Sequence, residues 1–153
     1  EFKEFPSLAI GSYGDNLLNI TNAYSAINNN GKIHSPSILE KIESFNKQSI
    51  WENKFISKKI LDFKVAKKVN KLLEKSVKEG TSKAAFIKGK KIYGKTGTSD
   101  GNKDLWFIGS IDNLTAGIWI GYDDNKKSEL SSGNAAYLWK KFIAEIFKIP
   151  IKK

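Results

Sequence analysis

The chain has no cysteine and a single histidine, His34, among its 153 residues. Without thiols there can be no disulfide, no thiolate nucleophile and no cysteine-ligated zinc or iron–sulfur site. A two-histidine metal site would need a second chain. The polar neighbours of His34, Lys32 and Ser35, favour a surface position or local hydrogen bonding instead. We therefore expect no metal and no cofactor.

Arginine and methionine are also missing, so all 26 basic residues are lysines and the net charge is +10. Segment 54–95 holds 14 lysines against Asp62, Glu74 and Glu79, which makes +11 there and −1 for the rest. Such a block can attract nucleic acid or an anionic membrane. However, there is no arginine to form paired hydrogen bonds with bases or phosphates. Nor do aromatic residues alternate with the lysines in the way that base stacking requires. The sequence favours a solvated helix face, without nucleic-acid or membrane contact by this segment.

Long apolar runs are lacking as well. Stretches such as Ala116–Ile120 are only a handful of residues long, whereas a membrane span needs about 20. The composition is 40% hydrophobic. A chain of this length can form one domain that buries roughly 70% of its unfolded surface. Because it begins at Glu1 and contains no methionine, we expect a piece of a longer or processed polypeptide.

Three helices are predicted from apolar spacing and capping residues. The first follows Asp15 or Asn16, carries Leu17, Ile20, Tyr24 and Ile27, and ends at 28–31. The second begins at the cap Asp62 and ends at Gly80, with the apolar stripe Val65, Ala66, Val69, Leu72, Leu73 and Val77. The third begins at the cap Asn134 and ends at Pro150, with the stripe Ala135, Leu138, Trp139, Phe142, Ile143 and Ile146.

Five strands are predicted around these helices. Segments 38–45 and 48–53 would form a hairpin with a turn at Asn46-Lys47. Segments 92–98, 105–111 and 114–122 would form the main sheet, and the Asp112-Asn113 link predicts an antiparallel hairpin with positive φ. The fold class is therefore α+β, an antiparallel sheet flanked by helices.

Two motifs overlap at the start of this sheet. Segment 89–96, Gly-Lys-Lys-Ile-Tyr-Gly-Lys-Thr, satisfies the pattern of a phosphate-binding loop. That loop requires a helix beginning at its Lys-Thr, so that helix N–H groups point at the phosphates. The residues after Thr96 are Gly-Thr-Ser-Asp-Gly-Asn, which do not begin a helix. The nucleotide-binding interpretation is therefore rejected.

The second motif is Lys95-Thr-Gly-Thr98. It lies in a longer pattern of Gly-Lys-Thr-Gly-Thr-Ser over 94–99, Asp-Leu-Trp-Phe-Ile-Gly over 104–109 and Gly-Ile-Trp-Ile-Gly-Tyr-Asp-Asp over 117–124. Segments 20–25, 77–81 and 133–139 add Ile-Thr-Asn-Ala-Tyr-Ser, Val-Lys-Glu-Gly-Thr and Gly-Asn-Ala-Ala-Tyr-Leu-Trp. Together, and in this order, these motifs resemble the C-terminal part of the transpeptidase domain of class A penicillin-binding proteins.

The resemblance implies a D,D-transpeptidase, which cross-links peptidoglycan stem peptides and is acylated by β-lactams. Its fold is an antiparallel sheet flanked by helices with a helical lobe, and its site lies between them. Three motifs build that site: a Ser-x-x-Lys nucleophile, a Ser-x-Asn and the Lys-Thr-Gly strand. Only the third is identified here in its proper place.

The resemblance assigns a role to each residue of this third motif. Lys95 would attract the terminal carboxylate of the substrate and support proton transfer through the Ser-x-Asn serine. The hydroxyls of Thr96 and Thr98 would bind that carboxylate, and Gly97 would let the substrate backbone lie close. The Thr98 N–H would be one of two oxyanion-hole donors. Lys95 and Thr98 are thus the implied catalytic residues, and Thr96, Gly97 and Thr98 the implied substrate-binding residues. For Trp106 and Phe107, strand alternation favours packing.

The other two motifs are not found where the family places them. Segment 44–47 reads Ser-x-x-Lys but lies at a predicted hairpin turn, whereas the nucleophile needs a helix N-terminus. Segment 132–134 reads Ser-x-Asn but follows the Lys-Thr-Gly strand instead of preceding it. We therefore expect 1–153 to be the C-terminal portion of one transpeptidase domain, lacking its N-terminal strands and nucleophile helix. Its parts would be a helical and hairpin part (1–90), a three-strand core (91–122) and a C-terminal helix (134–148).

Several further expectations depend on that interpretation. The chain alone would neither transpeptidate nor be acylated by penicillin. Strand 114–122 would be a bare edge that pairs with the upstream part of the same protein or with a second copy. The whole protein would be anchored by an upstream segment and lie outside the cytoplasm, in the periplasm or on the outer membrane face. The alternative is a non-catalytic penicillin-binding-like domain that serves as a binding or scaffold module.

Overall fold

The computed structural model describes residues 6–11 and 13–150. Its main sheet is antiparallel, in the order β5-β6-β7, and comprises β5 (Ile92–Thr98), β6 (Leu105–Ile111) and β7 (Leu114–Ile120). The predicted strands are confirmed, although β7 ends two residues before the expected 122. Asp112 in the β6–β7 turn has a φ of +50°, as the Asx-rich link predicted. The α+β fold class is confirmed.

Three helices flank the sheet: α1 (Leu17–Asn28), α2 (Phe63–Glu79) and α3 (Ser132–Ile146). The side chain of Asn16 caps α1 by accepting a hydrogen bond from the Asn19 N–H (2.9 Å). Asp62 caps α2 by accepting one from the Lys64 N–H (2.8 Å), and Gly80 ends this helix as predicted. Three short 3-10 turns, η1 (Pro6–Ile10), η2 (Lys83–Ala85) and η3 (Asp100–Asn102), connect the larger elements.

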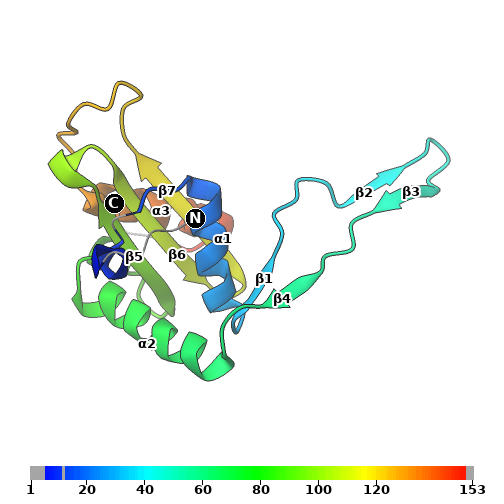
Figure 1. Cartoon of the computed structure of the whole chain (residues 1–153), viewed down its shortest axis with the longest axis horizontal. Coiled ribbons are helices and arrows are strands. Elements are labelled where there is room, and N and C mark those ends of the chain that lie inside the picture. Colours follow the sequence, from blue (N-terminus) through cyan, green and yellow to red (C-terminus); the bar gives the residue numbers. More distant parts are fainter. Residues whose placement is uncertain (1–5, 12, 151–153) are drawn as a thin grey trace.

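Helices α1 and α3 lie on opposite faces of the sheet. A Cβ on Gly117 would meet Thr21 and Leu17 of α1, whereas a Cβ on Gly109 would meet the Trp139 indole of α3 (2.9 Å). Gly109 pairs with Ala116, so Gly109 and Gly117 face opposite sides. Helix α2 packs mainly against β5, and Figure 1 shows it beside that strand.

The main core lies between the sheet and α3. The rings of Phe107 and Trp139 meet edge to face, with centroids 5.2 Å apart, and both side chains are fully buried. The Trp139 indole N–H donates to the Ala116 carbonyl (3.1 Å), so this large ring is buried without an unsatisfied polar group. The expected packing of Phe107 is confirmed, while Trp106 is partly buried on the other face.

The two predicted apolar stripes on α2 and α3 are only partly buried. Val65 and Leu72 of α2 are exposed, and Leu138, Phe142 and Ile146 of α3 are each nearly half exposed. The buried residues of α3 are Ala135, Ala136, Trp139, Ile143 and Ala144. Helix α3 therefore contacts the sheet mainly through alanines on either side of Trp139, because the Trp139 ring already fills the space above the sheet. This leaves an apolar ridge on the outer side of α3.

The ends of α3 differ from the expectation. Ser131 is the N-cap, and Asn134 lies within the first turn, where its Oδ1 accepts from the Ser131 N–H (2.8 Å). The helix ends at Ile146, four residues before Pro150. Lys148 adopts a φ of +50°, and the Ile149 N–H then bonds back to the Ala144 carbonyl (2.8 Å). A left-handed residue, not the proline, thus terminates the helix.

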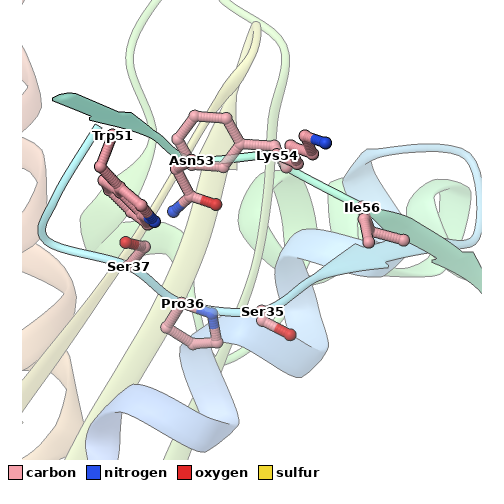
Figure 2. A pocket seen from close by; sticks show the side chains of 8 residues that line it. Ser35, Pro36, Ser37, Trp51, Asn53, Lys54 and Ile56 are labelled. Atoms are coloured by element: carbon pink, nitrogen blue, oxygen red, sulfur yellow. The ribbon is translucent and has the colours of Figure 1, made fainter. Parts of the chain in front are cut away.

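A two-part ribbon, the arm (32–60), projects away from the body between α1 and α2 (Figure 1). Its base pairs β1 (Lys32–His34) with β4 (Ser57–Lys59), and its tip pairs β2 (Lys41–Glu43) with β3 (Ser49–Glu52). The tip hairpin was predicted with longer strands, and the base pairing was not predicted. Trp51 of β3 and Asn53 just after it point toward Ser37 on the other limb of the arm (Figure 2). They help to line an open pocket of about 290 Å³.

Candidate functional site

The Lys-Thr-Gly motif occupies the end of β5, the edge strand of the main sheet. The Ser99 N–H bonds to the Asp104 carbonyl (3.0 Å), which continues the β5–β6 register and fixes which residues face β6. In an antiparallel ladder, alternate residues direct their N–H and C=O groups toward the partner strand. Gly97 and Lys95 therefore bond to β6, and Thr96 and Thr98 direct their backbone groups to the open edge.

Thr96 confirms this orientation, because its N–H donates to Ser82 Oγ (3.2 Å) outside the sheet. Ser82 is fully buried just beyond the C-terminal end of α2. Thr98 lies two residues further along the same edge and is exposed. The Thr98 N–H, which the resemblance assigns to the oxyanion hole, thus points outward from the edge of the sheet. Unlike the Thr96 N–H, it is not bonded to Ser82.

Lys95 is exposed, and its ammonium group is held against this edge. Its Nζ donates to the Thr96 carbonyl (2.9 Å) and lies 3.4 Å from Thr81 Oγ1 and 3.5 Å from Thr96 Oγ1. Among the described residues, no carboxylate forms an ion pair with Lys95. The positive charge of Lys95 is therefore available to an anion that comes from outside.

The two threonine hydroxyls of the motif lie in different surroundings. Thr98 is exposed, whereas the Thr96 residue is only 8% exposed. The Thr96 hydroxyl is paired with the Thr81 hydroxyl at 2.9 Å. Only Thr98 is thus openly presented, and carboxylate binding by both hydroxyls stays a prediction.

Gly97 is packed closely against the neighbouring strand. A Cβ at this position would lie 3.2 Å from the Cβ of Trp106, its partner on β6. The sequence argument for Gly97 was a close approach by substrate. The structure adds a second reason, which is the space that the Trp106 side chain occupies.

A polar network holds the loop that follows Thr98. The Ser99 hydroxyl donates to Asp104 Oδ2 (2.8 Å) and accepts from the Asp104 N–H (2.8 Å). The indole N–H of Trp119 on β7 donates to Asp104 Oδ1 (3.0 Å). Asp104 thereby ties the end of β5 to the far strand of the sheet. The sequence indicated Asp104 only as part of a motif, because Trp119 is a partner from another strand.

Thr81 and Ser82 were not predicted as members of this site. Thr81 was indicated only as the end of a family-like segment, 77–81, and Ser82 was not indicated at all. A signal was present, since a Gly followed by two hydroxyl residues directly ends a long helix. Their link to Thr96 spans 14 to 15 residues and depends on how α2 packs on β5.

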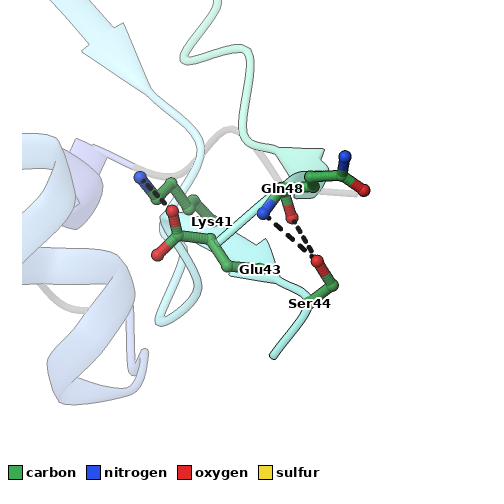
Figure 3. Close-up of polar contacts among 4 residues, drawn as sticks. All are labelled: Lys41, Glu43, Ser44 and Gln48. Carbon is green, nitrogen blue, oxygen red and sulfur yellow. Dashed lines mark hydrogen bonds and ion pairs between the residues drawn. The ribbon is translucent and has the colours of Figure 1, made fainter. Parts of the chain in front are cut away.

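The two misplaced motif copies are not joined to this edge. Ser44 lies at the tip of the arm, where its hydroxyl bonds within the turn to the Gln48 N–H (3.1 Å), beside the Lys41–Glu43 ion pair (Figure 3). The sequence predicted a hairpin turn here, and Ser44 indeed does not begin a helix. Ser132 is the first residue of α3. Lys95 and Thr96 lie within β5, which confirms that no phosphate-binding helix begins there.

The sequence favoured a surface position or local hydrogen bonding for His34. The residue is half-buried, and its carbonyl accepts a local hydrogen bond from the Asn22 side chain (3.1 Å). Its Nδ1 is buried without a partner among the described residues.

The family model described as penicillin-binding protein transpeptidase domain matches residues 3–142. The chain belongs to this family. Penicillin-binding protein 1A of Clostridium tetani is 32% identical over 151 residues, covering 93% of this chain and 19% of that protein. Penicillin-binding protein 1A of Aquifex aeolicus is 32% identical over 124 residues, covering 81% of this chain and 17% of that protein. The chain thus spans about a fifth of the length of these relatives.

Solved structures of penicillin-binding proteins share the fold of this transpeptidase segment. The penicillin-binding protein PonA1 from Mycobacterium tuberculosis matches 96% of this chain with a TM-score of 0.82 and 20% identity. Penicillin-binding protein 1A from Haemophilus influenzae matches 96% with a TM-score of 0.78 and 19% identity. The chain covers 42% and 28% of those two chains. In the described part of the transpeptidase segment, no helix is long and apolar enough to cross a bilayer.

Proposed function

We propose that this chain forms the carboxylate-binding side of a D,D-transpeptidase site in a class A penicillin-binding protein. The reaction cross-links peptidoglycan stem peptides by acyl transfer to and from a serine, and β-lactams acylate the same serine. The observation that carries the proposal is the open edge of β5. There Lys95 has no carboxylate partner among the described residues, and the Thr98 N–H points outward.

Each group at this edge has a separate task in that reaction. The Lys95 charge attracts the terminal carboxylate of the peptide, and the exposed Thr98 hydroxyl donates to it. The Thr98 N–H donates to the oxyanion that develops on the attacked carbonyl. Loss of one such donor lowers rates by about 100- to 1000-fold. Gly97 keeps the face of β5 flat, so that the peptide backbone can lie along it.

The nucleophile comes, in this proposal, from chain upstream of Glu1. Support comes from Ser44, the serine of the Ser-x-x-Lys copy, which lies at the arm tip and does not begin a helix. The Ser-x-Asn copy at 132–134 follows the sheet instead of preceding the Lys-Thr-Gly strand. The upstream part would also supply the Ser-x-Asn motif, a strand that pairs with β7, and an anchor. The assembled protein would work outside the cytoplasm, where peptidoglycan is built.

The test is a titration of the ¹⁵N-labelled chain with acetyl-D-alanyl-D-alanine, followed by NMR. The same dipeptide with a C-terminal amide is the charge control. We expect saturable shifts of the Thr96, Gly97 and Thr98 amides with the acid and much weaker binding of the amide. Lys95→Ala should abolish the preference for the acid, whereas Lys90→Ala, which removes an exposed lysine just before β5, should preserve it. Equal binding of acid and amide would refute a carboxylate-binding site at this edge.

A further inference from the structure

The segment between α2 and η2 contains two hydroxyl residues that the proposed reaction has not used. Thr81 and Ser82 follow Gly80, and both contact Thr96 of the motif strand. They are fixed by the helix end, because the N–H groups of Gly80 and Ser82 both donate to the Ser76 carbonyl (3.0 and 3.2 Å). A Cβ on Gly80 would lie 2.9 Å from that carbonyl oxygen, so the turn leaves no room for a side chain there.

Ser82 is a rigid support for the Thr96 backbone. Its residue is fully buried, and its Oγ lies 2.9 Å from Ser76 Oγ and accepts from the Thr96 N–H. Buried hydroxyls satisfied in this way hold one geometry, since a broken bond leaves an unpaired polar group. Ser82 thus fixes the distance between the end of α2 and β5, and it places Thr81 above the Thr96 side chain.

Thr81 contacts two groups of the motif at once. The Lys95 ammonium, which can only donate, lies 3.4 Å from Thr81 Oγ1 and 3.5 Å from Thr96 Oγ1. The two hydroxyls are also hydrogen-bonded to each other at 2.9 Å, and either can be the donor. Thr81 thus completes a triangle of contacts that holds the Lys95 charge beside the Thr96 side chain.

From these contacts we infer that Thr81 is a positioning residue for the carboxylate site. It keeps the Lys95 ammonium and the Thr96 hydroxyl fixed at the strand edge where a carboxylate would bind. The inference rests on the proposed function, since it names what orients the same site. Without the Thr81 hydroxyl, the Lys95 ammonium loses an acceptor and the Thr96 hydroxyl loses its side-chain partner.

The experiment compares Thr81→Val with Thr81→Ser in the 153-residue chain. Valine keeps the shape of threonine and removes the hydroxyl, whereas serine retains the hydroxyl. The readout is the Kd for acetyl-D-alanyl-D-alanine and for its amide, measured by NMR titration. We expect Thr81→Val to weaken binding of the acid about tenfold and to leave the amide unchanged, because a hydrogen bond to a charged group is lost. Thr81→Ser should return acid binding to within about twofold of the original chain.

A matched control removes a similar hydroxyl pair elsewhere. Thr115 Oγ1 on β7 lies 2.9 Å from Ser110 Oγ, the same distance as in the Thr81–Thr96 pair. Thr115→Val should leave the acid-to-amide ratio unchanged. Chemical unfolding of each variant separates a loss of fold from a loss of orientation, because a purely structural role of Thr81 would not change that ratio selectively.

The outcomes separate this inference from the function on which it rests. If the original chain prefers the acid and Thr81→Val retains that preference, the role of Thr81 is wrong, while the proposed carboxylate-binding site stands. Failure of Thr81→Ser to restore binding also overturns it, since the hydroxyl would then not be the active part. If the original chain shows no preference for the acid, the proposed function fails first and the positioning role fails with it.

Discussion

Asp104 shows at the scale of one residue how the end of β5 is held in place. Its carboxylate accepts from the Ser99 hydroxyl and the Trp119 indole, and its N–H donates to Ser99 Oγ. Asp104→Ala leaves two donors without their acceptor. We expect it to lower the free energy of unfolding by about 2 kcal/mol, measured by urea titration. The Thr98 amide signal should also shift.

The control for this change is Asp123→Ala. Asp123 is exposed beyond the end of β7, and its side chain has no hydrogen bond or ion pair within the described chain. Its replacement should alter stability by less than about 0.5 kcal/mol. Equal losses for the two variants would show that the Asp104 network does not hold the loop.

The site illustrates what sequence can and cannot predict at this scale. The identities of Lys95, Thr96, Gly97 and Thr98 follow from a local motif, and the structure shows them on an open strand edge. The burial of Thr96 and its pairing with Thr81 could not be predicted. They arise from packing of α2 against β5, and the spacing of residues within either element carries no information about that contact.

At the scale of an element, α2 carries a pH-dependent ion pair on its surface. The Glu74 carboxylate accepts from the Lys78 ammonium at 2.7 Å, and this hydrogen bond lowers the pKa of Glu74 from its ordinary value of 4.5. A carboxyl whose pKa is lower in the folded state stabilises the fold above its unfolded pKa. That stabilisation disappears as the pH falls through the folded pKa.

Glu74→Gln should therefore be slightly less stable than the original chain at pH 7, and the difference should disappear at acidic pH, as the pH falls through the folded pKa of Glu74. The effect is small because Lys78 is solvent exposed. Glu79→Gln is the control, since its contact with Lys75 is longer (3.8 Å) and exposed at both ends. Urea unfolding at the two pH values measures the gap, and a gap of constant size would contradict this account.

The elements differ in how well sequence predicts them. Helices α1 and α2 and the strands of the main sheet were predicted correctly, because apolar spacing, capping residues and turn residues are all local features of the sequence. The β1–β4 pairing was missed since each strand has three residues and the partners lie far apart in sequence, as Lys32 and Lys59 do. Leu138, Phe142 and Ile146 belong to the predicted apolar stripe of α3 but form an exposed ridge, because apolar spacing cannot say which part of a wide stripe meets the sheet.

At the scale of the whole molecule, β7 is the other edge of the main sheet in the described chain. Alternate residues of β6 bond to β5, so the residues between them bond to β7. The register between β6 and β7 therefore directs the N–H groups of Ala116 and Ile118 toward β6. Those of Thr115, Gly117 and Trp119 point outward. An outward row of unpaired N–H groups is a template for another strand.

Hydrogen exchange at different protein concentrations tests whether a second copy occupies this edge. If two copies pair through β7, the outward amides of Thr115, Gly117 and Trp119 become protected as concentration rises. The inward amides of Ala116 and Ile118 are internal controls and should be protected throughout. A chain that stays monomeric with fast-exchanging outward amides at every concentration would contradict pairing between copies.

The proposal for the whole molecule is that this chain is one side of a catalytic site and that the acylated serine lies upstream. Intact-mass measurement after incubation with penicillin tests this most directly. It should be applied to the 153-residue chain and to the protein translated with the residues that precede Glu1. We predict a stable penicilloyl adduct on the longer protein, mapped to a serine upstream of Glu1, and none on the chain alone. An adduct on the 153-residue chain, or no adduct on the longer protein, would contradict the claim, and the second result would favour a non-catalytic scaffold.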